Sequence, residues 1–76
     1  MYHTIEFRLR GLAELEAPGK AHLERLVIKQ GTRLRAQIKP YVVDTERGPV
    51  EVADLFLEDG SVARAVRYAT FKFVDA

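Results

Sequence analysis

The sequence predicts a mainly β protein, folded as a small and strongly bent five-stranded barrel with an extra strand at its N-terminus. Three observations predict this fold. Apolar and polar residues alternate along several short segments, which is the period of a half-buried strand. Turn-forming pairs such as Pro18-Gly19 and Asp59-Gly60 separate these segments. The 76 residues are enough for a single domain, residues 1–76, and a barrel of that size leaves few strand edges exposed.

The first predicted strand covers residues 3–10, where every second residue is apolar and the others are polar or charged. Ile5, Phe7 and Leu9 fall on one face, and Gly11 ends the strand. Residues 12–17 fit either a short strand or a turn of helix.

Two interpretations compete for residues 18–30. Pro18 can begin a helix and Gly31 can follow its end, but Leu26-Val27-Ile28 contains two β-branched residues. We predict a short helical turn near residues 18–23 and then a strand over residues 24–29. The alternative is one helix packed over a sheet, which would make the protein α+β and β-grasp-like.

Residues 32–39 form the clearest predicted strand, with a basic face and an apolar face. The basic face carries Arg33, Arg35 and Lys39. Pro40 cannot donate to a strand ladder, so it marks an edge or a bend, beyond which residues 41–43 can continue the strand.

The second half of the chain predicts a loop, a hairpin and a bend. Residues 44–49 are expected as a loop, and residues 50–58 as a strand rich in β-forming residues. Asp59-Gly60 predicts a two-residue type I′ hairpin, from which residues 61–67 return antiparallel. The alternation slips at Tyr68-Ala69, which indicates a bend or bulge before it resumes toward Val74.

Composition indicates how so small a chain is stabilised. A chain of this length buries only about 60% of the surface that its unfolded form exposes. It has no cysteine, so neither a disulfide nor a cysteine-based metal site can add stability. At 47% hydrophobic and 30% charged residues, it is typical of a globular protein. We therefore expect a homo-oligomer.

The two signs of charge are segregated along the chain. The net charge is only +1, which argues against a strongly electrostatic nucleic-acid binder. Residues 25–39 hold five basic residues and no acid, whereas residues 44–59 hold six acids and one base, Arg47. Such segments can be two separate solvated faces, or they can face each other within one chain or across a subunit contact. We expect them to lie near subunit contacts.

No motif points to catalysis, so we expect no enzyme, no cofactor, no metal and no small-molecule substrate. His3 and His22 have no companion at metal-ligand spacing, and no phosphate-binding glycine motif occurs. The longest apolar runs, such as Leu55-Phe56-Leu57, have three residues, too few for a membrane span or a signal sequence. We expect a cytoplasmic protein without membrane contact.

One stretch resembles the first motif of the Sm/LSm and Hfq-like family. Residues 28–41 contain a glycine followed at fixed spacing by aliphatic, small, branched and aromatic residues, namely Gly31, Leu34, Ala36, Ile38 and Tyr41. Val66-Arg67-Tyr68 stands where the family has its second motif, so the resemblance covers about residues 24–74. The chain departs from the family pattern at Ala36, usually glycine, at Val42, usually Asp or Asn, and at Tyr68.

The resemblance implies a homo-oligomeric ring that binds single-stranded RNA near its pore, on the loop after Tyr41 and the turn at Arg67-Tyr68. Tyr41 would stack a base, although it could instead close a barrel end. Arg67 would hold a phosphate, although a pair with Asp54 is the simpler expectation. The candidate RNA-binding residues are Tyr41, Asp44, Arg67, Tyr68, Arg33, Arg35 and Lys39. The alternative function is a small protein-interaction or structural module without nucleic acid.

Overall fold

The computed structural model describes residues 1–20 and 22–75, which form seven β-strands and one short 3-10 helix. The strands are β1 (His3–Phe7), β2 (Gly11–Glu16), β3 (Glu24–Ile28), β4 (Arg33–Thr45), β5 (Gly48–Leu57), β6 (Val62–Arg67) and β7 (Phe71–Phe73), with the 3-10 helix η1 (Tyr68–Thr70) before β7. No α-helix occurs in the described residues. The expectation of a mainly β fold is confirmed, and the described residues form an all-β sheet.

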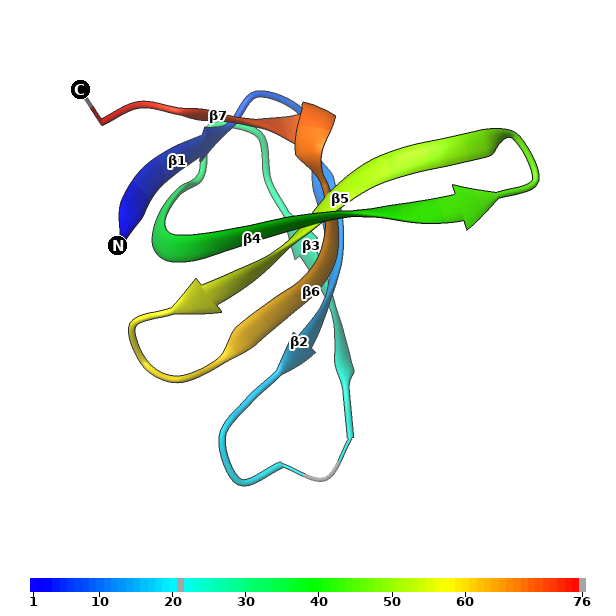
Figure 1. Cartoon of the computed structure of the whole chain (residues 1–76). Coiled ribbons are helices and arrows are strands. Elements are labelled where there is room, and N and C mark those ends of the chain that lie inside the picture. The colour runs from blue at the N-terminus through cyan, green and yellow to red at the C-terminus, as the bar shows by residue number, and fades with distance from the viewer. Residues whose placement is uncertain (21, 76) are drawn as a thin grey trace.

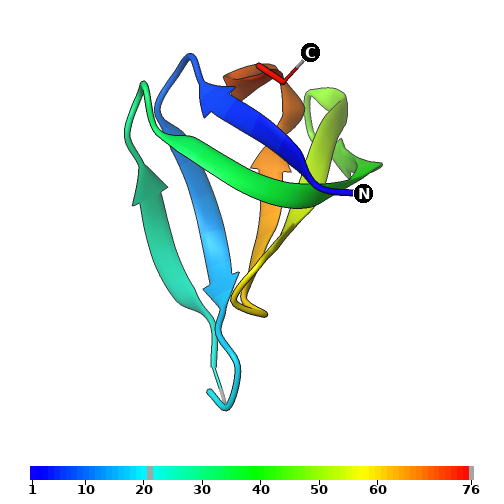
Figure 2. The same ribbon diagram turned by 90° about the vertical axis from the view of Figure 1, so that its left-hand side faces the viewer.

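The strands form one antiparallel sheet in the order β3-β2-β6-β5-β4-β1-β7. The sheet curls strongly into a half-barrel, as Figures 1 and 2 show. Its edge strands, β3 and β7, do not pair with each other in the described part of the chain, so the sheet is an open half-barrel and not the closed or nearly closed barrel that we expected. The sheet also has more strands than expected, because residues 11–16 form a strand.

The core lies on the concave side of the sheet. Its largest fully buried side chains are Phe7, Ile5, Leu55 and Val66. The predicted alternation holds for Ile5 and Phe7 but not for Leu9, which is 56% exposed. The reason is a bend after Phe7, where the amides of Arg8 and Leu9 both donate to the carbonyl of Thr70.

Residues 24–28 are a strand, so the single-helix interpretation of residues 18–30 is wrong. β3 pairs with β2, with Ile28 opposite Gly11, and this pairing buries Ile28 in the core. The predicted helical turn at residues 18–23 is also absent from its described part, where Pro18-Gly19 form a turn. Ala21 lies outside the described residues.

The expected loop at residues 44–49 is wrong, because β4 and β5 remain paired to a tight turn at Glu46-Arg47. Thr45 Oγ1 closes this turn by donating to the Gly48 carbonyl at 2.7 Å. Residues 41–43 continue β4, as expected. Pro40 is tolerated because β1 pairs with β4 only as far as Ala36, so that side of β4 needs no donor beyond it.

Residues 42–51, here called the arm, form the outer end of the β4–β5 hairpin. β6 pairs with β5 only from Val52 onward, and β1 does not reach the arm. The arm therefore projects from the half-barrel as two strands without a third, as Figure 1 shows.

The hairpin at Asp59-Gly60 is confirmed, but its turn type differs from the prediction. The Gly60 amide donates to the Leu57 carbonyl, so Glu58 and Asp59 are the central residues of the turn. Among the residues of this turn, only Gly60 has a positive φ, +90°. A type I′ turn requires a positive φ at both central residues, which here are Glu58 and Asp59. Asp59 instead accepts the amide hydrogen of Ser61 at 2.8 Å.

The chain bends where the alternation slips, because η1 separates β6 from β7. A second irregularity was not expected. The β5–β6 register shifts between Ala53 and Leu55, so that Arg64 and Ala65 together oppose Asp54. Such a β-bulge increases the local twist of the sheet. It lies beside the candidate site.

Candidate nucleic-acid interface

Tyr41 and Arg67 lie in one row across three strands. Val52 of β5 pairs with Tyr41 of β4 on one side and with Arg67 of β6 on the other. Residues directly opposite in an antiparallel sheet share a face, so all three side chains lie on the convex face. Two strand spacings separate Tyr41 from Arg67, about 10 Å. The structure thus brings two of the predicted RNA-binding residues together.

The position of the Tyr41 ring is fixed at its hydroxyl end. The hydroxyl donates to Asp54 Oδ1 at 2.8 Å, while the residue stays 36% exposed. Partial burial, followed by the hydrogen bond to the Asp54 carboxylate, raises the pKa of Tyr41. The ring is therefore neutral, anchored and still accessible to solvent.

Asp54 is the centre of the hydrogen-bond network beneath Tyr41. It is 8% exposed and accepts the Ala65 amide at 3.0 Å and Arg64 Nη1 at 2.9 Å. Burial raises the pKa of the Asp54 carboxyl, but the hydrogen bonds from Ala65, Tyr41 and Arg64 and the charge of Arg64 outweigh it, and the pKa is lowered. Arg64 also pairs with Glu16 at 3.0 Å. The carboxylate is therefore ionised and fully engaged.

The expected pair between Arg67 and Asp54 is wrong, because the bulge puts Arg67 opposite Val52 and gives Asp54 to Arg64. Arg67 is consequently exposed, and it lines a shallow cavity of about 320 Å³ with the arm turn at residues 45–47. The sequence did signal an acid among apolar residues with an arginine across the hairpin. It gave no sign of which arginine, because no glycine marks the bulge.

The basic stripe on β4 lies on the convex face, as its alternation predicts, but two of its members are ion-paired. Arg33 pairs with Glu6 at 2.8 Å, and Arg35 pairs with Glu58 at 3.7 Å. Lys39 makes no ion pair with any described residue. Two positions from Tyr41 on the same face, it is the member of the stripe whose charge is available to a ligand.

Asp44 and Tyr68 do not join this row. Asp44 is exposed on the arm, on the face opposite to Tyr41 by the strand alternation. Tyr68 packs inward against the core, with its ring 5.1 Å from that of Phe71. The pair Arg67-Tyr68 is therefore split between the convex and concave sides of the sheet.

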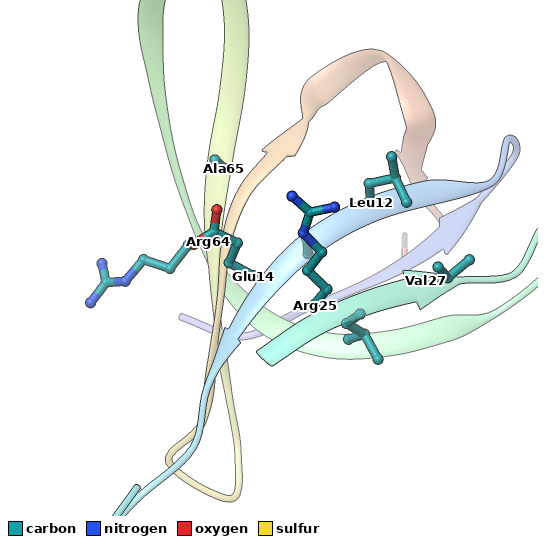
Figure 3. Close-up of a pocket in the computed structure, with 8 residues that line it drawn as sticks. Leu12, Glu14, Arg25, Val27, Arg64 and Ala65 are labelled. Atoms are coloured by element: carbon teal, nitrogen blue, oxygen red, sulfur yellow. The ribbon is translucent and has the colours of Figure 1, made fainter. Parts of the chain in front are cut away.

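A larger cavity of about 440 Å³ lies at the bulge, between β2, β3 and β6. Figure 3 shows the Arg25 side chain beside it, with Leu12 and Val27 along its rim, while the Arg64 side chain points away. Among the described residues no group of three or more His, Asp or Glu side chains could hold a metal ion. The described residues also include no helix that is long and apolar enough to cross a membrane.

A scan against protein-family models, a search of curated proteins and a search of solved structures each give no match to this chain.

Proposed function

We propose that the protein binds single-stranded RNA on the convex face of β4, β5 and β6. Tyr41 stacks an unpaired base, and Arg67 and Lys39 hold the adjacent phosphates. The observation that carries the proposal is the row of Tyr41, Val52 and Arg67. It places an anchored aromatic ring on the same face as a guanidinium that has no ion-pair partner among the described residues. The resemblance to Sm-like proteins supports it, because it selects the same tyrosine and arginine.

The chemistry of single-stranded RNA suits this row. Unstacked bases are recognised by stacking on aromatic rings or guanidinium planes, which is worth about 1–3 kcal/mol per base. Duplex RNA offers no such free base. Tyr41 has its hydroxyl occupied by Asp54, so the ring, and not the hydroxyl, is the part offered to the ligand.

Several identical sites are part of the proposal. A single chain with a net charge of +1 attracts RNA weakly, and two of the three residues of the basic stripe, Arg33 and Arg35, are already paired. Linking equivalent sites in a homo-oligomer raises the overall affinity without new contacts. The proposal therefore includes that the half-barrel is the subunit of an Sm-like ring.

Fluorescence anisotropy with labelled oligo-U and oligo-A, at two salt concentrations, tests the proposal. Arg67→Ala should weaken binding about fivefold or more, and should lower the salt dependence because one phosphate contact is lost. Arg10→Ala is the matched control, an exposed arginine away from the row. Arg8 is a poorer control because its Nε donates to the Ala69 carbonyl at 2.9 Å, beside η1. Equal losses in both variants would contradict the proposal.

The second candidate is a protein-interaction module, which the open side of the half-barrel favours. An apolar hollow of about 350 Å³ lies there between β3 and β4. If the assembled protein binds no oligonucleotide even at low salt, this candidate takes the place of RNA binding.

A further inference from the structure

β3 is an edge strand with hollows on both of its faces. Leu26 and Val27 line both the cavity at the bulge and the apolar hollow inside the half-barrel. Val27 is 55% exposed, and its cross-strand neighbour Leu12 is 67% exposed. Natural proteins usually protect a free strand edge with charged side chains, a bulge, a proline or a covering segment. β3 carries the charged residues Glu24 and Arg25, but it has no proline, and its pairing with β2 has no bulge.

The basic side chains of and beside β3 have no ion-pair partner among the described residues, whereas Glu24 pairs with Lys20. Arg25 lines the cavity at the bulge, and Lys29 lines the hollow on the concave side. Neither makes an ion pair with another described residue. An occupant that fits β3 must therefore combine apolar side chains with acidic ones.

The arm has this composition. Val42 is 61% exposed at a position where no third strand covers it. The arm also carries Asp44, Glu46 and Glu51, none of which is ion-paired in the described structure, against the single base Arg47. No described strand pairs with the outer edge of either strand of the arm, so both edges can form backbone hydrogen bonds with a partner.

The arm of a chain does not reach its own β3. Figures 1 and 2 place the end of the arm and β3 on different sides of the molecule. The surface that complements β3 is consequently offered by another copy of the chain.

We propose that the arm of one copy docks on β3 of the next copy. Val42 then covers the apolar surface around Val27, and the acids of the arm approach Arg25 and Lys29. Because the donor and acceptor surfaces differ, the contact is heterologous and builds a closed ring or an open chain. It goes beyond RNA binding, since neither Tyr41 nor Arg67 takes part.

Light scattering on two complementary variants tests this contact. Val42→Asp disables the arm but leaves β3 intact, and Val27→Asp disables β3 but leaves the arm intact. The wild-type protein should be larger than 8.6 kDa, and each variant alone should dissociate about tenfold more readily. Mixed together, they should form a complex of about 17 kDa, twice the mass of one chain, because one good arm meets one good β3.

Leu9→Asp is the matched control, since Leu9 is 56% exposed and belongs to neither surface. It should assemble like the wild type. Circular dichroism should show that each variant is folded, and if an aspartate variant is not, Glu51→Lys and Arg25→Glu replace the pair. In that case each charge reversal alone should weaken assembly, and the double variant should restore it.

A wild-type monomer at every concentration would overturn the proposal. So would folded complementary variants that fail to combine on mixing, because a symmetric contact of arm with arm or β3 with β3 cannot be rescued in this way. A Leu9→Asp protein that dissociates like the other two would also overturn it. None of these outcomes depends on RNA, so they leave the RNA-binding proposal to its own test.

Discussion

The amide of Ala65 donates to Asp54 Oδ1 at 3.0 Å, at the point where β5 and β6 shift register. Ala65 is the one described residue other than glycine with a positive φ, +57°. The carboxylate thus satisfies the backbone group that the bulge removes from the strand ladder. The same oxygen anchors Tyr41, so the bulge and the candidate RNA-binding row depend on one side chain.

Asp54→Ala should lower the free energy of unfolding by about 2–4 kcal/mol, because the Ala65 amide and the Tyr41 hydroxyl lose their acceptor. Urea denaturation measures the change. Asp44→Ala is the matched control, since Asp44 is exposed and its side chain makes no hydrogen bond or ion pair with another described residue. Its effect should stay within about 0.5 kcal/mol of zero. Similar losses in both variants would show that the network contributes little.

Acid should destabilise the wild type more than Asp54→Asn. Hydrogen bonds to the ionised carboxylate lower the pKa of Asp54 in the folded protein. A lowered folded pKa gives stability that is present above the unfolded pKa, about 3.9, and is lost as the pH falls through the folded value. Thermal unfolding of both proteins from pH 6 downward measures this, and the difference between the two curves should shrink below about pH 4.

Asp59 adds a second loss in the same direction, because hydrogen bonds from Ser61 lower its pKa. That loss is common to both proteins and cancels in the comparison. Parallel curves for the wild type and Asp54→Asn would contradict the assignment of Asp54.

Ala65→Gly should stabilise the protein by about 0.5–1 kcal/mol. A left-handed backbone strains any residue with a Cβ by about 1–2 kcal/mol. Part of the stability gained by removing this strain is lost, because glycine has more conformational freedom than alanine in the unfolded chain. Ala63→Gly is the contrast, because Ala63 is fully buried in the same strand without a positive φ. That variant should be less stable than the wild type. A destabilised Ala65→Gly protein would show that Ala65 is not strained.

Gly60→Val should destabilise the protein by about 1–2 kcal/mol, because a β-branched residue resists the φ of +90° at this position. A Cβ there would also lie 3.2 Å from Pro18 Cγ, closer than ordinary packing allows. Gly60→Asn should be milder, since asparagine tolerates a left-handed backbone better. Denaturant unfolding of the three proteins gives the order, and equal stability of the two variants would contradict it.

Much of the sheet is predictable because its strands bury one face. Alternation identified β1 and the first part of β4 and assigned Arg33, Arg35 and Lys39 to the solvent side, and the content of β-forming residues identified β5. The turns were harder to predict. Residues 44–49 have the composition of an open loop, although here they form a tight turn that the hydrogen bond from Thr45 to Gly48 closes. Whether the barrel closes depends on pairing between distant strands, which local periodicity does not report.

The candidate site was predictable only by residue type. Tyr41 and Arg67 lie in one row because both pair with Val52, from opposite sides. The register of Arg67 depends on the bulge at Ala65. Alanine carries no turn signal, so the sequence offered no means of placing the bulge. Tyr68 was expected beside Arg67 on one surface, but consecutive residues at the end of a strand point to opposite sides.

Anisotropy titration of labelled oligo-U with Tyr41→Phe and Tyr41→Ala tests the central claim most directly. Both variants lose the hydroxyl group that donates a hydrogen bond to Asp54, but only Tyr41→Ala removes the ring. Stacking on the ring predicts that Tyr41→Phe binds within about twofold of the wild type and that Tyr41→Ala binds at least about fivefold more weakly. Equal affinity in all three proteins, or equal losses in both variants, would contradict base stacking on Tyr41.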